Sequence, residues 1–232
     1  FCSRAGGAIA KYARAAADVR VVALTYGERS ESGGLYAETP VPTLEEIKEI
    51  RRAEATRAAE ILGAQISFLD WGDLRFEYTQ ERARLLGEEV RAFRPDAILT
   101  HHGPDSQSVD HDTTAHLVDR AVQLAGATGL ESAYPPARRA PVFYFEATVP
   151  LTELEGFNPD VYVDITDVWE VKLQALRAFE RSQGFLAEWY ADQARLRAFQ
   201  ARRLSGRSDI VYAEAFERTS PWVGDALPLN AK

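Results

Sequence analysis

Short apolar runs and longer amphipathic stretches alternate along the chain. The short runs have the length and composition of buried strands and are bounded by turn residues. They lie at residues 19–26, 65–71 and 97–101. The longer stretches place apolar residues at helical spacing and predict helices. They lie at residues 5–17, 43–62, 79–93 and 112–125. The second of these begins with a capping box, Thr43 followed by Glu46, and ends at Gly63.

The order of these elements indicates an α/β fold. Helices that alternate with strands are typical of a parallel sheet with crossover helices. In the C-terminal part we expect three strands and two helices, at residues 142–147, 161–165, 210–216, 168–181 and 186–203. We therefore predict a Rossmann-like, mostly parallel sheet with helices on both faces, in a single domain over residues 1–232. No strand precedes the first helix, so we expect a first strand upstream of Phe1 in the full protein.

Composition narrows the possible partners. A net charge of −8 argues against a sequence-independent grip on nucleic acid. We expect no membrane segment, since no apolar run reaches the length of a membrane span, and no signal segment opens the chain. The single Cys2 excludes an internal disulfide, which favours a cytoplasmic location. The C-terminal helices carry Trp189, Tyr190 and Phe199, which could bury against a second subunit of a homo-oligomer, with core packing as the default explanation.

All four histidines fall within residues 101–116, and three aspartates lie among them. Imidazole and carboxylate groups together suit a divalent metal such as zinc, or proton transfer near neutral pH. His111 lies where a loop enters a helix at the C-terminal edge of the sheet, where open α/β sheets bind ligands. Asp110, or a neighbouring carboxylate, could orient its imidazole. The alternative is a helix-capping aspartate beside a surface histidine.

The other histidines have different expected roles. His116 is five positions after His111 and therefore lies almost on the opposite helix face, so we expect it to be structural. His101 and His102 end a strand and alternate sides. We expect His101 to face the ligand crevice and His102 to pack against the protein.

Charged residues elsewhere are ambiguous from the residues alone. In the loop 27–32, a carboxylate could act as a general base and Arg29 could bind a substrate carboxylate. A solvated loop whose charges pair with one another explains the same residues. We expect the charged run 51–54 to be an ordinary solvated helix face without a function of its own. Glu146 follows an aromatic strand and either lines a pocket or meets water.

Taken together, several segments resemble the LmbE-like, or PIG-L, family of zinc-dependent N-deacetylases over roughly residues 4–125. The segments that carry the resemblance are residues 27–32, 51–64, 68–73, 94–102 and 110–111. Within that family the chain is more similar to the 4-oxalomesaconate hydratase branch, which adds water to an unsaturated tricarboxylate. That similarity covers nearly the whole chain and includes residues 27–32, 145–150, 160–166 and 212–216.

The resemblance implies a zinc ion held by His111 and by a His-x-x-Asp motif that would lie upstream of Phe1. It implies a hydro-lyase that adds water to a small unsaturated polycarboxylate. On this hypothesis Glu31 and Asp110 are catalytic, with Glu31 as the base. The substrate-binding residues are Arg29, Arg51, His101 and Glu146. Two alternatives stay open: a zinc-dependent N-deacetylase of an acetylated sugar or conjugate, and a binding protein that has lost its metal.

Overall fold

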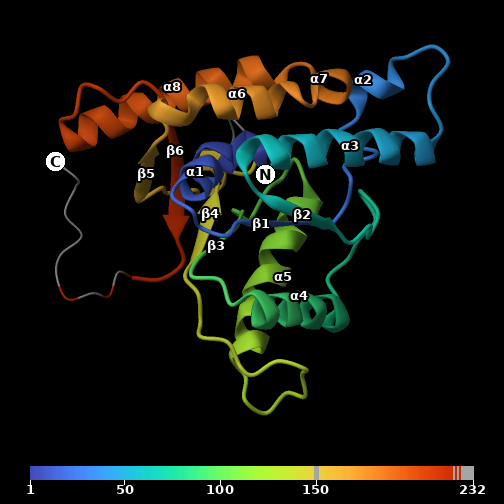
Figure 1. The fold of residues 1–232 in the computed structure, drawn as a ribbon, viewed down its shortest axis with the longest axis vertical. Coiled ribbons are helices and arrows are strands. Elements are labelled where there is room, and N and C mark those ends of the chain that lie inside the picture. The colour runs from blue at the N-terminus through green and yellow to red at the C-terminus, as the bar shows by residue number, and fades with distance from the viewer. Residues whose placement is uncertain (149–151, 222, 224, 226–232) are drawn as a thin grey trace. The chain divides into compact units, whose positions relative to one another are not determined.

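A computed structural model describes residues 1–148, 152–221, 223 and 225 (Figure 1). The chain forms two compact units, each of which is described by itself. Unit 1 comprises Phe1–Phe76 and Tyr162–Glu214, and unit 2 comprises Glu77–Val161 and Ala215–Lys232. Both units combine strands with helices, so the predicted α/β class is confirmed. In the part of the chain that the structure describes, no helix has the length and apolar character needed to cross a membrane.

Unit 1 contains a two-stranded parallel sheet, β1 (Arg20–Ala23) with β2 (Gln65–Phe68). The apolar run predicts that β1 is buried, but the strand is only half-buried. The described sheet has two strands, so β1 pairs with a neighbour on one side only. The helices of the unit are α1 (Cys2–Arg14), α2 (Gly33–Tyr36), α3 (Leu44–Leu62), α6 (Trp169–Arg177), α7 (Glu180–Gln183) and α8 (Leu186–Ser205). The short 3-10 helix η2 (Thr166–Val168) precedes α6.

Local sequence signals explain the ends of α3. The hydroxyl of Thr43 accepts the backbone N–H of Glu46 at 3.3 Å, and the Glu46 carboxylate accepts the N–H of Thr43 at 2.7 Å. Gly63 follows the helix with a φ of +78°, a left-handed conformation that favours glycine. The predicted capping box and stop signal are therefore both confirmed. A helix with fixed ends also fixes which of its side chains face the core, among them the fully buried Ile47.

A buried ion pair anchors α1 within unit 1. The Glu214 carboxylate accepts the N–H groups of Gly7 and Ala8, both at 2.7 Å, and pairs with Lys172 at 2.7 Å. A Cβ atom on Gly7 would lie 2.5 Å from the side chain of Ile165, so only glycine permits this approach. Because both charges are buried and bonded, removal of either one would leave the other without its partner in the core.

Unit 2 is built on a sheet in which β3 (Ile98–His101) and β4 (Val142–Phe145) are parallel. β6 (Ala213–Arg218) runs antiparallel to β4, with Phe145 opposite Phe216. The strand order is β3-β4-β6-β5, where β5 is Val161–Asp164, and the chain passes between the units within β5 and β6.

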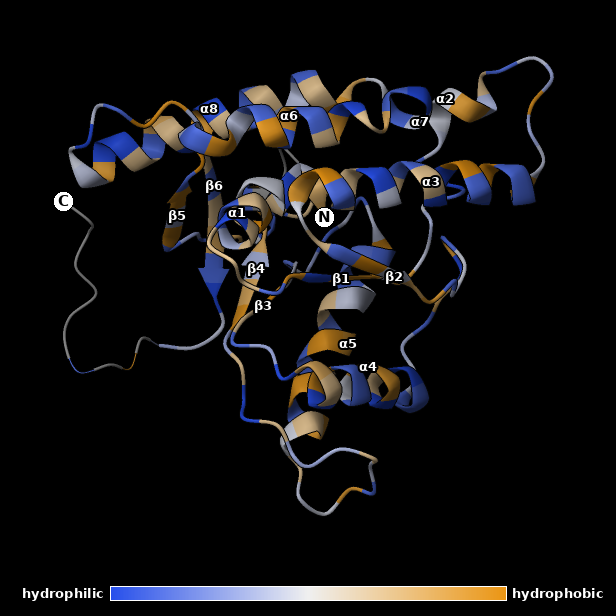
Figure 2. Ribbon diagram, in the orientation of Figure 1, coloured by the Kyte–Doolittle hydropathy of each residue, from blue (hydrophilic) through white to orange (hydrophobic). Residues whose placement is uncertain are grey.

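The helices of unit 2 are α4 (Gln80–Phe93) and α5 (Val109–Gly126), which pack against each other, and the 3-10 helix η1 (Thr152–Glu155). Figure 2 shows α4 banded in orange and blue, as the helical spacing of its apolar residues predicts. α5 begins at Val109, three residues before its predicted start, so that Asp110 and His111 lie in its first turn.

Candidate functional site

In unit 2 the His111 imidazole is held by a buried carboxylate. Its Nδ1 lies 2.7 Å from Oδ2 of Asp105, whose side chain is fully buried. The Asp105 carboxylate also accepts the hydroxyl of Thr148 at 2.9 Å and the N–H of Gln107 at 2.9 Å. A carboxylate on Nδ1 places the proton there and leaves Nε2 as the nitrogen with the lone pair, as in metal-ligating histidines.

The same contacts set the charge of Asp105. Burial would raise the pKa of this carboxyl, but the hydrogen bonds from His111, Gln107 and Thr148 outweigh burial and hold the pKa at about 2. Asp105 is therefore ionised at neutral pH. An ionised, immobilised carboxylate increases the basicity of the imidazole that it contacts.

His101 is the last residue of β3 and His102 follows it, and their rings have different neighbours. The His101 ring stacks on that of His111, with centroids 4.0 Å apart, and meets Phe145 edge-on. His102 is buried and meets the rings of Tyr144 and Phe157 edge-on. His101 is thus the histidine beside His111.

The remaining candidates of unit 2 have other surroundings. Asp110 is half-buried, and its backbone carbonyl accepts the hydroxyl of Thr114. Glu146 follows β4 and is only 4% exposed. His116 is exposed on α5. Residues 149 and 150, which close the segment that resembles the hydratase branch, lie outside the described residues.

The fit of a metal ion can be judged from the residues present. His111 can offer Nε2 to a metal, because its Nδ1 is bonded to Asp105. A zinc site needs three or four such protein ligands. Across residues 1–148, 152–221, 223 and 225, no group of three or more His, Cys, Asp or Glu side chains is arranged to hold a metal. The described residues therefore provide one fitting ligand and not a complete set.

In unit 1 the loop 27–32 leaves the C-terminal side of β1 and turns sharply. Gly27 has a φ of +68°, and a Cβ atom there would lie 3.0 Å from both the Arg51 guanidinium and the Glu31 carboxylate. The carbonyl of Gly27 accepts the hydroxyl of the buried Ser32 at 2.8 Å. Glycine thus allows Glu31 and Arg51 to approach each other.

Arg51 is buried, so the expectation of a solvated face for the run 51–54 is wrong at this residue. Its guanidinium forms hydrogen bonds within unit 1. Nε donates to the carbonyl of Tyr26 at 2.9 Å, and one Nη donates to Ser182 at 2.7 Å. The other Nη lies 3.3 Å from Oε2 of Glu31, whose side chain is 40% exposed. The Ser182 hydroxyl in turn donates to the buried Glu54 at 2.6 Å. Glu31 is therefore fixed at one oxygen and still reaches the surface.

A second buried carboxylate holds the backbone of the same loop. Asp73 is 3% exposed, and its Oδ2 accepts the N–H of Arg29 at 2.7 Å and the N–H of Ser30 at 2.6 Å. The N–H of Asp73 donates to Oε1 of Glu28, which is 1% exposed, at 3.0 Å. We call this reciprocal pair the Glu28–Asp73 clasp. It fixes the stretch that carries Arg29 and Glu31.

The predicted residues thus fall into two groups, Arg29, Glu31 and Arg51 in unit 1 and His101, Asp110, His111 and Glu146 in unit 2. Sequence reasoning missed the groups behind them: Asp73, Glu54 and Ser182 in unit 1, and Thr148 in unit 2. Asp105 carried a detectable signal, since it lies six residues before His111 among the histidines.

A histidine with one ring nitrogen bonded to a carboxylate is typical of metal ligands. The sequence pattern of the family described as PIG-L, GlcNAc-PI de-N-acetylase, matches residues 2–122. The chain therefore belongs to the PIG-L family, whose enzymes are generally metal-dependent.

Individual relatives include a hydratase and a deacetylase. The chain is 35% identical over 230 residues to the 4-oxalmesaconate hydratase of Pseudomonas putida strain KT2440, covering 98% of this chain and 88% of that protein. It is 31% identical over 187 residues to the diacetylchitobiose deacetylase of Thermococcus kodakarensis, covering 75% and 63%. The crystal structure of GalB, the 4-carboxy-2-hydroxymuconate hydratase of Pseudomonas putida KT2440, matches with a TM-score of 0.92 and 36% identity, covering 98% and 94%.

Proposed function

We propose that this chain acts as a zinc-dependent hydro-lyase that adds water to a small unsaturated polycarboxylate, as its hydratase relative does. The observation that carries the proposal is the extent of that similarity, 98% of the chain against 75% for the deacetylase. The resemblance to GalB over 98% of the chain supports it.

Glu31 is proposed as the base that accepts a proton from water. Hydration of a conjugated double bond forms a carbon–oxygen bond, moves the π electrons toward the substrate carbonyl and returns a proton to the adjacent carbon. A base in this step needs one fixed orientation and access to substrate. The contacts of Glu31 support this role, because Arg51 binds one carboxylate oxygen while 40% of the side chain is exposed.

The arginines of unit 1 divide into two proposed roles. We propose that Arg29 binds a substrate carboxylate, since a guanidinium can bind a carboxylate through two hydrogen bonds. Arg29 is half-buried, and Asp73 holds its backbone. Arg51 is buried and bonded to Tyr26, Ser182 and Glu31, so we propose that it orients the base and does not bind substrate.

His111 is proposed as a zinc ligand through Nε2, with Asp105 fixing its tautomer. When bound, zinc would supply a Lewis acid that stabilises negative charge on a substrate oxygen or acidifies a water molecule. His101 stacks on the His111 ring and restricts its rotation. We also propose that His101 and Glu146 bind substrate and that Asp110 takes part in catalysis.

Deacetylation of an acetylated sugar is the second candidate, because the family pattern and the Thermococcus kodakarensis relative carry that name. The two activities are separated by initial rates of the full-length, zinc-supplemented protein. Loss of the ultraviolet absorbance of 4-carboxy-2-hydroxymuconate would report hydration, and acetate release from diacetylchitobiose would report deacetylation. We expect the first and not the second. Acetate release without hydration would overturn the hydro-lyase proposal in favour of a deacetylase.

A further inference from the structure

The outer face of α8 carries large apolar side chains that the proposed function does not use. Phe185, Trp189, Leu196 and Phe199 are 42%, 54%, 45% and 55% exposed. The rings of Phe185 and Trp189 lie 4.4 Å apart and form one continuous surface. Monomeric proteins rarely leave several aromatic side chains contiguous and exposed on one helix face.

These residues belong to a regular stripe along the helix. The exposed residues on its centre line are Phe185, Trp189, Asp192, Leu196, Phe199 and Arg203, which we call the α8 stripe. Successive members are four, three, four, three and four residues apart. This spacing is the one by which a helix packs lengthwise along another helix. The stripe therefore has the geometry of a helix–helix contact and not of scattered surface residues.

The stripe is also symmetric about position 194. A second α8 that runs antiparallel places each stripe residue opposite a stripe residue of the other copy. In this register Trp189 faces Phe199, and Phe185 faces Arg203, an aromatic pair and a cation–π pair. A two-fold axis requires this self-complementarity of a single surface.

The charges around the stripe favour the antiparallel direction. The exposed acidic residues Glu188 and Asp192 lie in the N-terminal half of α8, and Arg195 and Arg203 lie in the C-terminal half. Antiparallel pairing sets each acidic half against a basic half, whereas parallel pairing would set like charges together. Asp192 pairs with Arg195 of its own helix at 2.9 Å, and both are more than half exposed, so they can re-pair across an interface.

We propose that two copies of this chain associate through the α8 stripe about a two-fold axis, with their α8 helices antiparallel. Tryptophan, phenylalanine and arginine are the residues that protein interfaces favour, and charges at the border of an apolar contact select the partner's orientation. The occupant of this face is therefore a second copy of the protein. This proposal does not depend on the reaction that the protein catalyses.

Sedimentation velocity of the full-length protein tests the stripe. We expect a dimer in the wild type, and Trp189→Glu or Phe199→Glu to weaken dimerisation by roughly 30-fold, as for an aromatic residue at the centre of an interface. Leu204→Glu is the matched control, since Leu204 is 70% exposed on the same helix but lies off the stripe. A monomeric wild type would overturn the proposal, and so would a dimer that both stripe variants leave intact.

Charge exchange tests the direction of pairing. Asp192→Arg should weaken the dimer, because position 192, which is opposite Leu196 in this register, also lies next to Arg195 of the other copy. The double variant Asp192→Arg, Arg195→Asp should restore the dimer, since opposite charges again meet across the two-fold axis. Failure of the double variant to recover, with a circular dichroism spectrum equal to that of the wild type, would contradict the antiparallel arrangement.

Discussion

The loop after β1 and the segment after β3 both follow the C-terminal side of a parallel strand, yet they hold their functional groups differently. In the loop, Asp73 fixes the backbone and Arg51 fixes the Glu31 carboxylate, while the rest of that side chain stays exposed. In the segment, Asp105 fixes only the His111 ring. The difference suits the proposed roles, since a base must keep both its position and access to substrate, whereas a metal ligand needs mainly one orientation.

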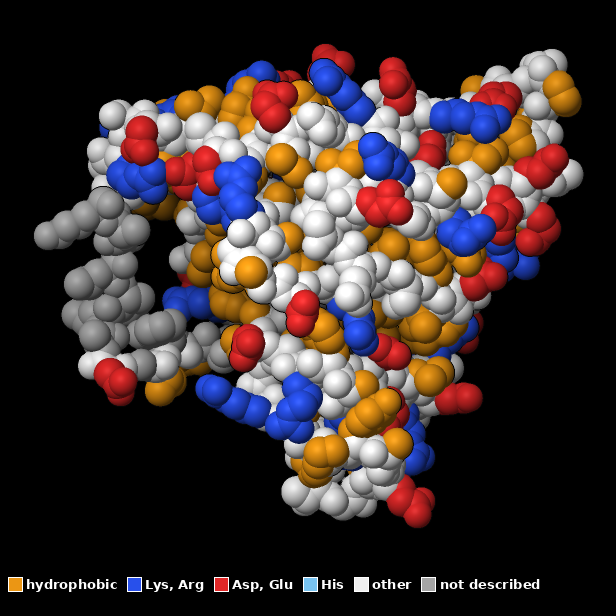
Figure 3. Space-filling model, in the orientation of Figure 1, with side chains coloured by type: hydrophobic (Ala, Val, Ile, Leu, Met, Phe, Trp, Pro, Cys, Tyr) orange, Lys and Arg blue, Asp and Glu red, His pale blue; other side chains and the backbone are white. Residues whose placement is uncertain are grey.

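Charged side chains of both signs are mixed on the molecular surface that Figure 3 shows. Lys and Arg side chains alternate with Asp and Glu side chains over the face that Figure 3 shows, and no area of a single charge dominates that face. Because the net charge is −8, we propose that carboxylate recognition depends on individual guanidinium groups such as that of Arg29 and not on a broad positive surface.

Replacement of His111 should have the largest effect on function. His111→Ala removes the proposed zinc ligand, and we expect hydration to fall by at least roughly 1,000-fold with loss of bound zinc. Zinc content by mass spectrometry and initial rates would measure both. His116→Ala changes an exposed histidine on the same helix and should leave both near wild type. Normal zinc content in His111→Ala would remove His111 from the metal site.

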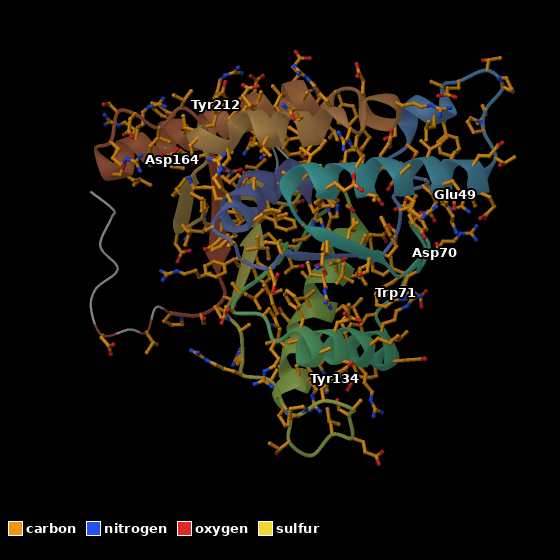
Figure 4. The ribbon with its side chains drawn as sticks, viewed as in Figure 1. Glu49, Asp70, Trp71, Tyr134, Asp164 and Tyr212 are labelled. Atoms are coloured by element: carbon orange, nitrogen blue, oxygen red, sulfur yellow. The ribbon has the colours of Figure 1, made fainter. Side chains whose placement is uncertain are left out.

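Glu31→Gln should separate the chemical step from metal binding. The amide keeps the size of the side chain but cannot accept the proton, so we expect hydration to fall by about 100- to 1,000-fold with zinc retained. Glu49→Gln is the control, since Glu49 is exposed on α3 and pairs with Arg52 at the surface (Figure 4). Equal rates in Glu31→Gln and wild type would exclude Glu31 as the base.

Asp105→Asn should weaken zinc binding by about 10- to 100-fold, because the neutral amide no longer holds the imidazole as a carboxylate does. It should also change the pH dependence of stability. The pKa of Asp105 is about 2 in the folded protein and 3.8 ordinarily, so the ionised carboxylate stabilises the fold above pH 4. This contribution, roughly 2 kcal/mol, is lost as the pH falls toward 2.

Urea unfolding at pH 7 and at pH 3 measures this second effect. The free energy of unfolding of Asp105→Asn should lie below that of the wild type at pH 7, and the difference should shrink at pH 3. A difference that stays constant between the two pH values would show that the charge of Asp105 does not stabilise the fold.

Asp73→Asn should reduce hydration less than the substitutions of His111, Glu31 and Asp105. It weakens the Glu28–Asp73 clasp, so we expect kcat to fall by about tenfold while zinc content is unchanged. Asp70→Asn is a matched control three residues earlier, since Asp70 is 44% exposed and pairs with Lys48 at 2.9 Å (Figure 4). Equal kcat values for the two variants would show that the clasp does not position the loop.

The sequence predicted the features that depend on neighbouring residues. The capping box of α3 is a local pattern, and the structure reproduces it. The framework behind Glu31 depends on long-range contacts: Asp73 lies 43 residues from Ser30, and Ser182 lies 128 residues from Glu54. No periodicity links such pairs.

Asp105 is an intermediate case between local and long-range contacts. It lies six residues before His111, and two other aspartates, Asp110 and Asp112, are nearer in sequence. Because α5 begins at Val109, those two side chains are in its first turn, whereas Asp105 precedes the helix and reaches the His111 ring. The helix start, which sequence patterns place only approximately, decides which carboxylate contacts the imidazole.

We propose that His111 binds the metal and that Glu31 transfers the proton. The most direct test measures zinc content and the hydration rate of 4-carboxy-2-hydroxymuconate on the same preparations of wild type, His111→Ala and Glu31→Gln. We predict that His111→Ala loses both and that Glu31→Gln keeps zinc but loses hydration. Hydration by Glu31→Gln at the wild-type rate, or by zinc-free wild type, would contradict the claim.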